Sequence, residues 1–139
     1  MNPPNFLTSS LLVASGGAVG AWLRFLVGRL WTGAIGPVAA SAFPWATLTV
    51  NVLGSFAMGL LGGWLARHSA MQAWGGEGWR LLLGVGVLGG FTTFSAFSLE
   101  MVNFIERSAL VAAAVYMLVS LAAGVLGLFA ALAVMRTAT

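Results

Sequence analysis

The chain has 139 residues, enough for one domain, and carries only six arginines, three glutamates and no cysteine. Charged residues make up 6% of the chain and apolar residues 60%, whereas a soluble domain has about 25% charged residues. A small soluble fold cannot bury so much apolar surface, and six separate arginines form no nucleic-acid-binding patch. The composition therefore predicts an integral membrane protein and excludes a cytosolic enzyme and a nucleic-acid-binding protein.

Four uncharged stretches divide the chain. Charge is absent from residues 1–23, 30–66, 81–99 and 108–135. Because a bilayer crossing takes about 20 apolar residues, the fold class is an all-α membrane protein with four transmembrane helices. We predict these helices at roughly 6–30, 44–66, 78–104 and 109–135. The N-terminus lacks the basic segment of a cleaved signal peptide, so the first helix is expected to remain in the mature protein.

Small residues recur four positions apart on three of the predicted helices. These pairs are Gly16 and Gly20, Gly59 and Gly63, and Gly86 and Gly90. The spacing lets helix backbones approach closely and predicts tight packing, within the chain or with a partner.

The connections between the helices are short. The first contains the turn-forming residues Gly33, Gly36 and Pro37. The third is only residues 106–108, so the third and fourth helices are predicted to be antiparallel neighbours. Tryptophans lie near the predicted helix ends, as in the aromatic belts of membrane proteins. They are Trp31 and Trp45 at one end, and Trp64, Trp74 and Trp79 at the other.

The arginines are balanced between the two sides of the membrane. The side with the N-terminus, second connection and C-terminus has Arg67, Arg80 and Arg136, and the other side has Arg24, Arg29 and Arg107. The side richer in Lys and Arg normally stays cytoplasmic, so a difference of 3 − 3 = 0 predicts insertion in both orientations. Two opposite copies could then form an antiparallel, dual-topology homodimer. Alternatively, the assumed span boundaries obscure a real bias.

The second predicted helix carries Thr47, Asn51 and Ser55 at intervals of four residues, on one face. Asn51 lies near the middle of this helix and offers both donors and an acceptor. Polar groups inside a span are functional candidates. Equally, they are side chains that hold two helices together. Position alone leaves the two roles equally weighted.

The third predicted helix should break near its middle. Gly89 and Gly90 are followed by two β-branched residues, Thr92 and Thr93, a pattern that predicts non-helical backbone at this depth. Broken membrane helices present backbone carbonyls to cations.

Phe91, Phe94 and Phe97 follow at intervals of three residues. A phenylalanine stripe usually faces lipid or the core, but the positive edges of these rings could also stabilise an anion. Glu100, near the end of this helix, either pairs with Arg24 or is a solvated helix-end charge.

The fourth predicted helix has a similar polar line of Tyr116 and Ser120, continued by Gly124. Such a line indicates a polar cavity or a neighbouring helix, although a serine can also bond its own helix. The sequence has no catalytic Ser/His/Asp set and no cluster of metal ligands, so no enzyme is expected.

Three segments resemble the Fluc/CrcB fluoride channels. They begin at Gly16 (GGAVGAWLR), Thr47 (TLTVNVLGSF) and Gly89 (GGFTTFSAF). Length, span number and motif order agree over nearly the whole chain. One departure is Ala96, where the family often has threonine.

The resemblance implies a passive fluoride channel of a prokaryotic inner (plasma) membrane, built as an antiparallel homodimer with two pores. The implied pathway residues are Asn51, Phe94, Phe97, Tyr116, Ser120 and Thr47, with Arg24 near a vestibule. The backbone carbonyls of Gly89 and Thr92 would bind a structural Na⁺ at the dimer centre.

Two other functions compete with the channel. A small dual-topology multidrug exporter would also be a four-helix homodimer, but such exporters depend on a glutamate in the first span, and residues 6–23 contain no acid. The other competitor is a membrane scaffold, in which Asn51 and the phenylalanines only pack.

Overall fold

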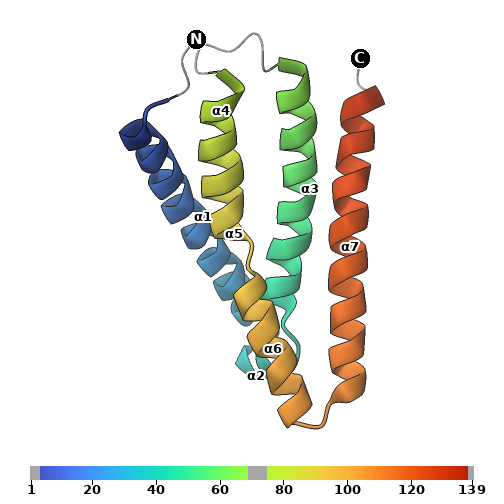
Figure 1. Cartoon of the computed structure of the whole chain (residues 1–139). Helices are drawn as coiled ribbons and strands as arrows, with labels where there is room; N and C mark the ends of the chain where they lie inside the picture. The colour runs from blue at the N-terminus through green and yellow to red at the C-terminus, as the bar shows by residue number, and fades with distance from the viewer. Residues whose placement is uncertain (1–3, 69–74, 138–139) are drawn as a thin grey trace.

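The computed structural model describes residues 4–68 and 75–137, and every regular element within them is a helix. Four helices are long and apolar enough to cross a membrane. They span Phe6–Ile35, Trp45–His68, Gly76–Glu106 and Leu110–Thr137. The predicted four-span, all-helical membrane fold is therefore confirmed. The start of the first helix and the end of the last lie at the same end of the molecule, as an even number of spans requires (Figure 1).

Helix α1 (Phe6–Ile35) starts at an asparagine cap, where Asn5 Oδ1 accepts the N–H of Thr8 at 2.9 Å. The helix continues past the predicted end at residue 30 and stops at Gly36, whose φ of 82° suits a glycine. Pro37 then begins a short helix, α2 (Pro37–Ala42), where its fixed φ fits the first helical turn. Helix α2 was not predicted, because Gly33, Gly36 and Pro37 are typical of a turn.

The third span is composite and broken, as predicted. It consists of α4 (Gly75–Trp79), the π-helix η1 (Arg80–Leu88), α5 (Gly89–Phe91) and α6 (Phe94–Glu106). Between α5 and α6, Thr92 and Thr93 are extended, with ψ angles of 163° and 124°. The π-helix upstream of the break was not expected. It is wider than an α-helix, and Gly84 and Gly86 are both buried inside it.

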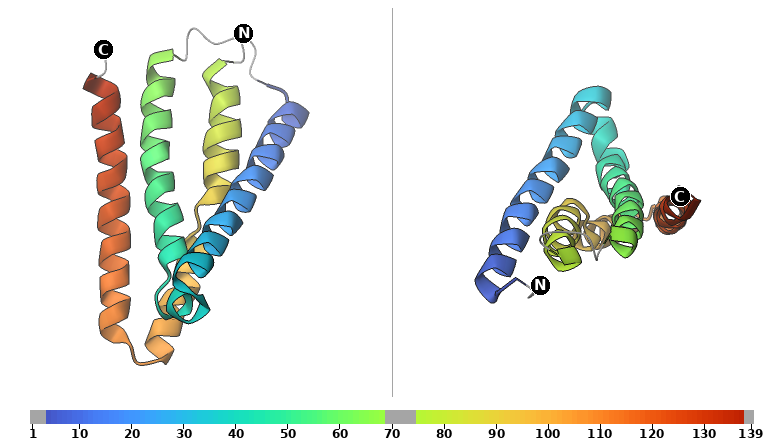
Figure 2. Two further views of the ribbon diagram at one scale, coloured as in Figure 1. Left: turned by 180° about the vertical axis from the view of Figure 1, so that it is seen from behind. Right: turned by 90° about the horizontal axis from the view of Figure 1, so that it is seen from above.

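The spans form two close pairs rather than a symmetric bundle. Helix α1 packs along η1 and α5, and α3 (Trp45–His68) packs along α7 (Leu110–Thr137). Seen along the helices, α1 and α7 lie on opposite sides of the molecule (Figure 2). Among the described residues, the third and fourth spans meet mainly through α6 and α7, because the break separates the direction of α6 from that of η1. The prediction that these spans are neighbours is thus correct for α6 and wrong for η1.

Glycines make both pairs possible. A Cβ added at Gly86 would lie 2.9 Å from the Cα of Gly16, and one added at Gly59 would lie 2.6 Å from the carbonyl oxygen of Leu128. Neither position has room for a side chain without moving backbone. The predicted close packing of helix backbones is therefore confirmed, and it occurs within the chain.

The buried core of the chain is small and centres on Tyr116, which is 0% exposed. Phe104 and Ala113 are buried beside it, and Phe43 and Phe97 pack against this cluster. Large apolar side chains elsewhere are exposed, including Phe6 and Phe129. Such a surface requires lipid or another apolar chain around it, as expected of a multi-pass membrane protein.

Aromatic side chains gather near both ends of the spans, as predicted. Trp31 stacks on Trp45 at a ring distance of 5.6 Å, and Trp64 meets Trp79 edge to face at 6.0 Å. Trp74 lies outside the described residues.

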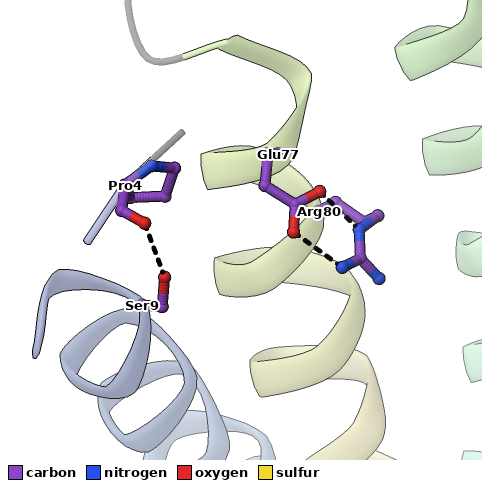
Figure 3. Close-up of polar contacts among 4 residues, drawn as sticks. All are labelled: Pro4, Ser9, Glu77 and Arg80. Carbon is purple, nitrogen blue, oxygen red and sulfur yellow. Dashed lines mark hydrogen bonds and ion pairs between the residues drawn. The ribbon is translucent and has the colours of Figure 1, made fainter. Parts of the chain in front are cut away.

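Figure 3 shows polar contacts of Pro4, Ser9, Glu77 and Arg80, at the end of the molecule where α1 begins. Arg80 Nη2 lies 2.7 Å from Glu77 Oε1 in a two-pronged ion pair. Nearby on α1, Ser9 Oγ donates to the carbonyl oxygen of Pro4 at 3.3 Å. The Glu77–Arg80 pair places two charges at the start of the third span, where water can reach them.

Candidate functional site

The helix break is held from another helix by Asn51. The Thr93 N–H donates to Asn51 Oδ1 at 2.8 Å, and Asn51 Nδ2 donates to the Thr93 carbonyl at 3.0 Å. In a continuous helix the Thr93 N–H would have bonded the carbonyl of Gly89. The asparagine side chain therefore replaces helical hydrogen bonds that the break removes, as backbone at this depth requires.

A second side chain reaches the break from α1. Arg24 Nη1 donates to the carbonyl oxygen of Thr92 at 3.2 Å. This oxygen also lacks its helical donor, because the N–H of Ala96 donates to Thr93 Oγ1 at the start of α6. The predicted pairing of Arg24 with Glu100 is wrong. The freed backbone carbonyl, rather than a carboxylate, is the partner of the guanidinium.

A cavity of about 330 Å³ opens beside the break. Its polar walls come from three helices: Asn51 and Ser55 on α3, Thr92 and Thr93 at the break, and Ser120 on α7. Phe94 and Phe97 form part of its apolar wall. The structure thus brings together Asn51, Phe94, Phe97 and Ser120, four of the residues proposed from sequence.

Ser120 and Phe94 both offer groups to a ligand in this cavity. Ser120 Oγ is buried and makes no hydrogen bond within the described part of the chain. Phe94 is 80% exposed, so its ring is accessible beside the polar break. A small ligand in the cavity would therefore find both a hydroxyl and an aromatic ring.

Aromatic rings connect this cavity to the core. The ring of Phe97 lies 5.9 Å from that of Phe94 and 5.1 Å from that of Tyr116. Phe97 is thus the middle of a row from the exposed Phe94 to the buried Tyr116. The row follows from the spacing of Phe94 and Phe97 on α6, which places both on the side facing α7.

The carboxylate of Glu100 lies at the far end of this row. Glu100 Oε2 accepts the hydroxyl of Tyr116, and Oε1 accepts the hydroxyl of Thr47, both at 2.6 Å. These are charge-assisted lengths. Tyr116 and Thr47 are among the predicted site residues, whereas Glu100 was not predicted to lie with them. The available signal was that Glu100 follows Phe97 by three residues and so shares its helix face.

Glu100 and Thr47 also line a second cavity, of about 260 Å³, near α2. Its other polar groups include Asn103 and Arg107. The two cavities therefore flank the Phe97–Tyr116–Glu100 cluster, one at the break and one at the opposite end of α6. Arg24, expected near a vestibule, lines neither of these cavities and contacts the break instead.

The two carbonyls predicted to bind Na⁺ differ in their surroundings. Gly89 is exposed, and its carbonyl has lost its helical donor to Asn51, so it suits a hard cation. The carbonyl of Thr92 already accepts from Arg24 and has one lone pair left. The carbonyl oxygen of Gly89 is therefore available to bind a cation. At Thr92, a cation would share the carbonyl oxygen with the guanidinium of Arg24.

Residues 11–132 match the family described as CrcB-like protein, Camphor Resistance (CrcB). The chain belongs to the CrcB family. This confirms the resemblance found in its three motifs, and it places the helix break of this CrcB-family chain within the matched residues.

Curated relatives of this CrcB-family chain cover nearly all of it. The "Fluoride-specific ion channel FluC" of Novosphingobium aromaticivorans is 54% identical over 130 residues, which are 94% of this chain and 98% of that protein. The protein with the same name from Erythrobacter litoralis is 52% identical over 85% of this chain and 83% of its own length. That from Rhodospirillum centenum is 51% identical over 92% and 95%.

Proposed function

We propose that this chain is a fluoride-selective ion channel of a prokaryotic inner membrane. It lets cytoplasmic fluoride leave passively, down its electrochemical gradient, and so gives fluoride resistance. The names of its bacterial relatives support this function. The observation that carries it is the single cavity at the helix break, which collects Asn51, Phe94, Phe97 and Ser120.

The chemistry of this cavity suits a small, strongly hydrated anion. Such an ion gives up water only where hydrogen-bond donors replace it. Ser120 has a free hydroxyl, and the Asn51 amide has one N–H left after its bond to Thr93. No arginine lines the cavity. Neutral donors hold the anion weakly enough for it to leave, as conduction requires.

An anion that passes Glu100 has to compete with its carboxylate for hydrogen-bond donors. The hydroxyls of Tyr116 and Thr47 are both donated to the carboxylate of Glu100. An anion that moves between the two cavities competes with this carboxylate for the same O–H groups. Glu100 therefore orients the donors and keeps an anion from settling on them.

The channel is proposed to be an antiparallel homodimer with two pores, embedded in the lipid bilayer. Exposed apolar side chains on every span leave room for a second copy. Because Arg24 lies at the break, it no longer counts toward either side of the membrane. The remaining arginines divide as three (Arg67, Arg80, Arg136) against two (Arg29, Arg107), a near-balance that still supports dual topology.

A structural Na⁺ is proposed at the centre of this dimer. Gly89 and Thr92 of each copy would offer their carbonyl oxygens to it, which would fix the two breaks against each other. Bound there, the ion would supply positive potential near the pores. The exposed carbonyl of Gly89 is the feature of this chain that supports the proposal.

Efflux from liposomes tests the function. Purified protein should release fluoride from loaded vesicles without a proton gradient, and should release chloride far more slowly. Proton-coupled drug uptake would instead support the multidrug exporter, which the names of the relatives do not favour. Vesicles that retain fluoride as well as protein-free vesicles do would support the scaffold and refute the channel.

A further inference from the structure

We propose that Arg24 is a positioning residue that holds the helix break in its conducting shape, and this inference rests on the proposed function. Arg24 was expected at a vestibule, yet its guanidinium lies 3.2 Å from the Thr92 carbonyl, 68 residues further along the chain. It thereby fixes the extended segment from which α6 starts, and α6 carries Phe94 and Phe97.

The position of Arg24 follows from how α1 is packed. Its preceding turns lie against the third span without intervening side chains, since Gly16 meets Gly86 and Gly20 meets the backbone of Val87 and Phe91. Arg24 comes one turn after Gly20, opposite the residues that follow Phe91. The packing of α1 on η1 and α5 therefore places the Arg24 side chain beside the end of α5.

The energetics favour this contact over solvent. Arg24 is half-buried within a membrane span, where a charged side chain is costly unless it is satisfied. Within the part of the chain that the structure describes, Arg24 has no carboxylate partner. The Thr92 carbonyl has lost its helical donor to the cap of α6. The guanidinium and the carbonyl each satisfy the other.

Arg24 and Asn51 satisfy different backbone groups at the break. Asn51 satisfies the N–H and carbonyl of Thr93 from α3, and Arg24 satisfies the carbonyl of Thr92 from α1. Two adjacent residues are thus held by side chains from two different helices. The Thr92 carbonyl and the Thr93 N–H belong to one planar peptide group, so Arg24 and Asn51 hold its two ends. Without Arg24, the bond from Asn51 is the one that remains on this peptide, and the start of α6 is held less firmly.

The sequence allows this contact to be measured directly. Thr92–Thr93 is the single Thr–Thr step in the chain. Labelling threonine with ¹³C at the carbonyl and with ¹⁵N at the amide therefore gives one cross-peak in a spectrum that correlates each amide with the preceding carbonyl. That peak reports the hydrogen bond to the Thr92 carbonyl and the hydrogen bond from the Thr93 N–H together.

We expect Arg24→Met to move the Thr92 carbonyl resonance upfield, because its hydrogen bond is lost, and to reduce fluoride efflux. Arg24→Lys, which keeps a charged donor, should restore part of the shift and part of the efflux. Arg29→Met is the matched control, because Arg29 is an exposed arginine on the same helix, and it should leave the peak unchanged.

An Arg24→Met spectrum identical to the wild-type spectrum would overturn the proposal, whatever happens to efflux, since Arg24 would then act through charge alone. If Arg24→Met does not fold, the shift in Arg24→Lys and in Arg24→Gln decides the question in the same way. A wild-type protein that fails to conduct fluoride would refute the channel, yet the spectra would still show whether Arg24 holds the break.

Discussion

Both ends of the Asn51 side-chain amide are bonded to the main chain of a single residue, Thr93. The asparagine therefore does two things at once. It satisfies a broken helix, and it leaves one N–H for the cavity beside the break. The two roles that sequence analysis weighed equally for Asn51, packing and pathway, are compatible in one geometry.

Replacement of Asn51 by leucine should remove both bonds. Two interhelical hydrogen bonds in a membrane contribute about 0.6 kcal/mol each, and an unsatisfied buried N–H costs about 1–3 kcal/mol. We therefore expect the free energy of unfolding in detergent to fall by about 1–3 kcal/mol, together with a large loss of fluoride efflux. Ser15→Ala, which removes a hydroxyl bonded to its own helix, is the control. Normal efflux in Asn51→Leu would exclude Asn51 from the pathway.

Phe94 is exposed, so its replacement tests function with little effect on stability. Phe94→Ile should reduce fluoride efflux sharply while leaving the proposed dimer intact, because the ring that lines the cavity is lost but no core contact is. Phe129→Ile changes an equally apolar, exposed side chain on α7 and should conduct normally. Efflux and size-exclusion chromatography measure the two properties. Undiminished efflux in Phe94→Ile would remove this residue from the pathway.

The hydroxyls of Thr47 and Tyr116 share one carboxylate, so their contributions should not be additive. In a double-mutant cycle of Thr47→Val and Tyr116→Phe, we expect a coupling energy of about 0.5–3 kcal/mol in unfolding. The cycle repeated in a Glu100→Gln background should show a smaller coupling, since the shared charge is gone. Additive effects in the wild-type background would mean that Glu100 does not link the two hydroxyls.

Backbone contact between α1 and η1 makes Gly86 intolerant of any side chain. Gly86→Ala should lower the free energy of unfolding by about 1–3 kcal/mol, because its Cβ would overlap the backbone of Gly16. Gly62→Ala has open space around the new methyl group and should be neutral or stabilising by up to about 1 kcal/mol. Equal stability of the two variants would contradict the packing described for α1.

Dual topology is tested by the location of the C-terminus. Because the arginines are nearly balanced, a C-terminal tag should be found on both sides of the membrane, by protease protection of vesicles. Additional arginines in the third connection, beside Arg107, should shift the population toward one orientation. A single orientation of the unmodified chain would rule out the antiparallel dimer.

Several features could be predicted from local sequence alone. The number of spans follows from the length of uncharged stretches, and the break follows from Gly89 and Gly90 before two β-branched threonines. The close helix contacts follow from glycines spaced four apart. Each of these depends on residues near one another in the chain, whose effect on the backbone is largely local.

The partners of the polar side chains were decided only by tertiary structure. For Glu100, the sequence left open a pairing with Arg24 or a solvated charge at the helix end. Neither occurs, because the break exposes a carbonyl close to Arg24 and the direction of α6 carries Glu100 to Tyr116 and Thr47. Sequence determined where the chain crosses the bilayer and where it breaks. The packing of α1 on η1 and of α3 on α7 determined which distant groups satisfy that break, since such contacts depend on helix directions that no local pattern encodes.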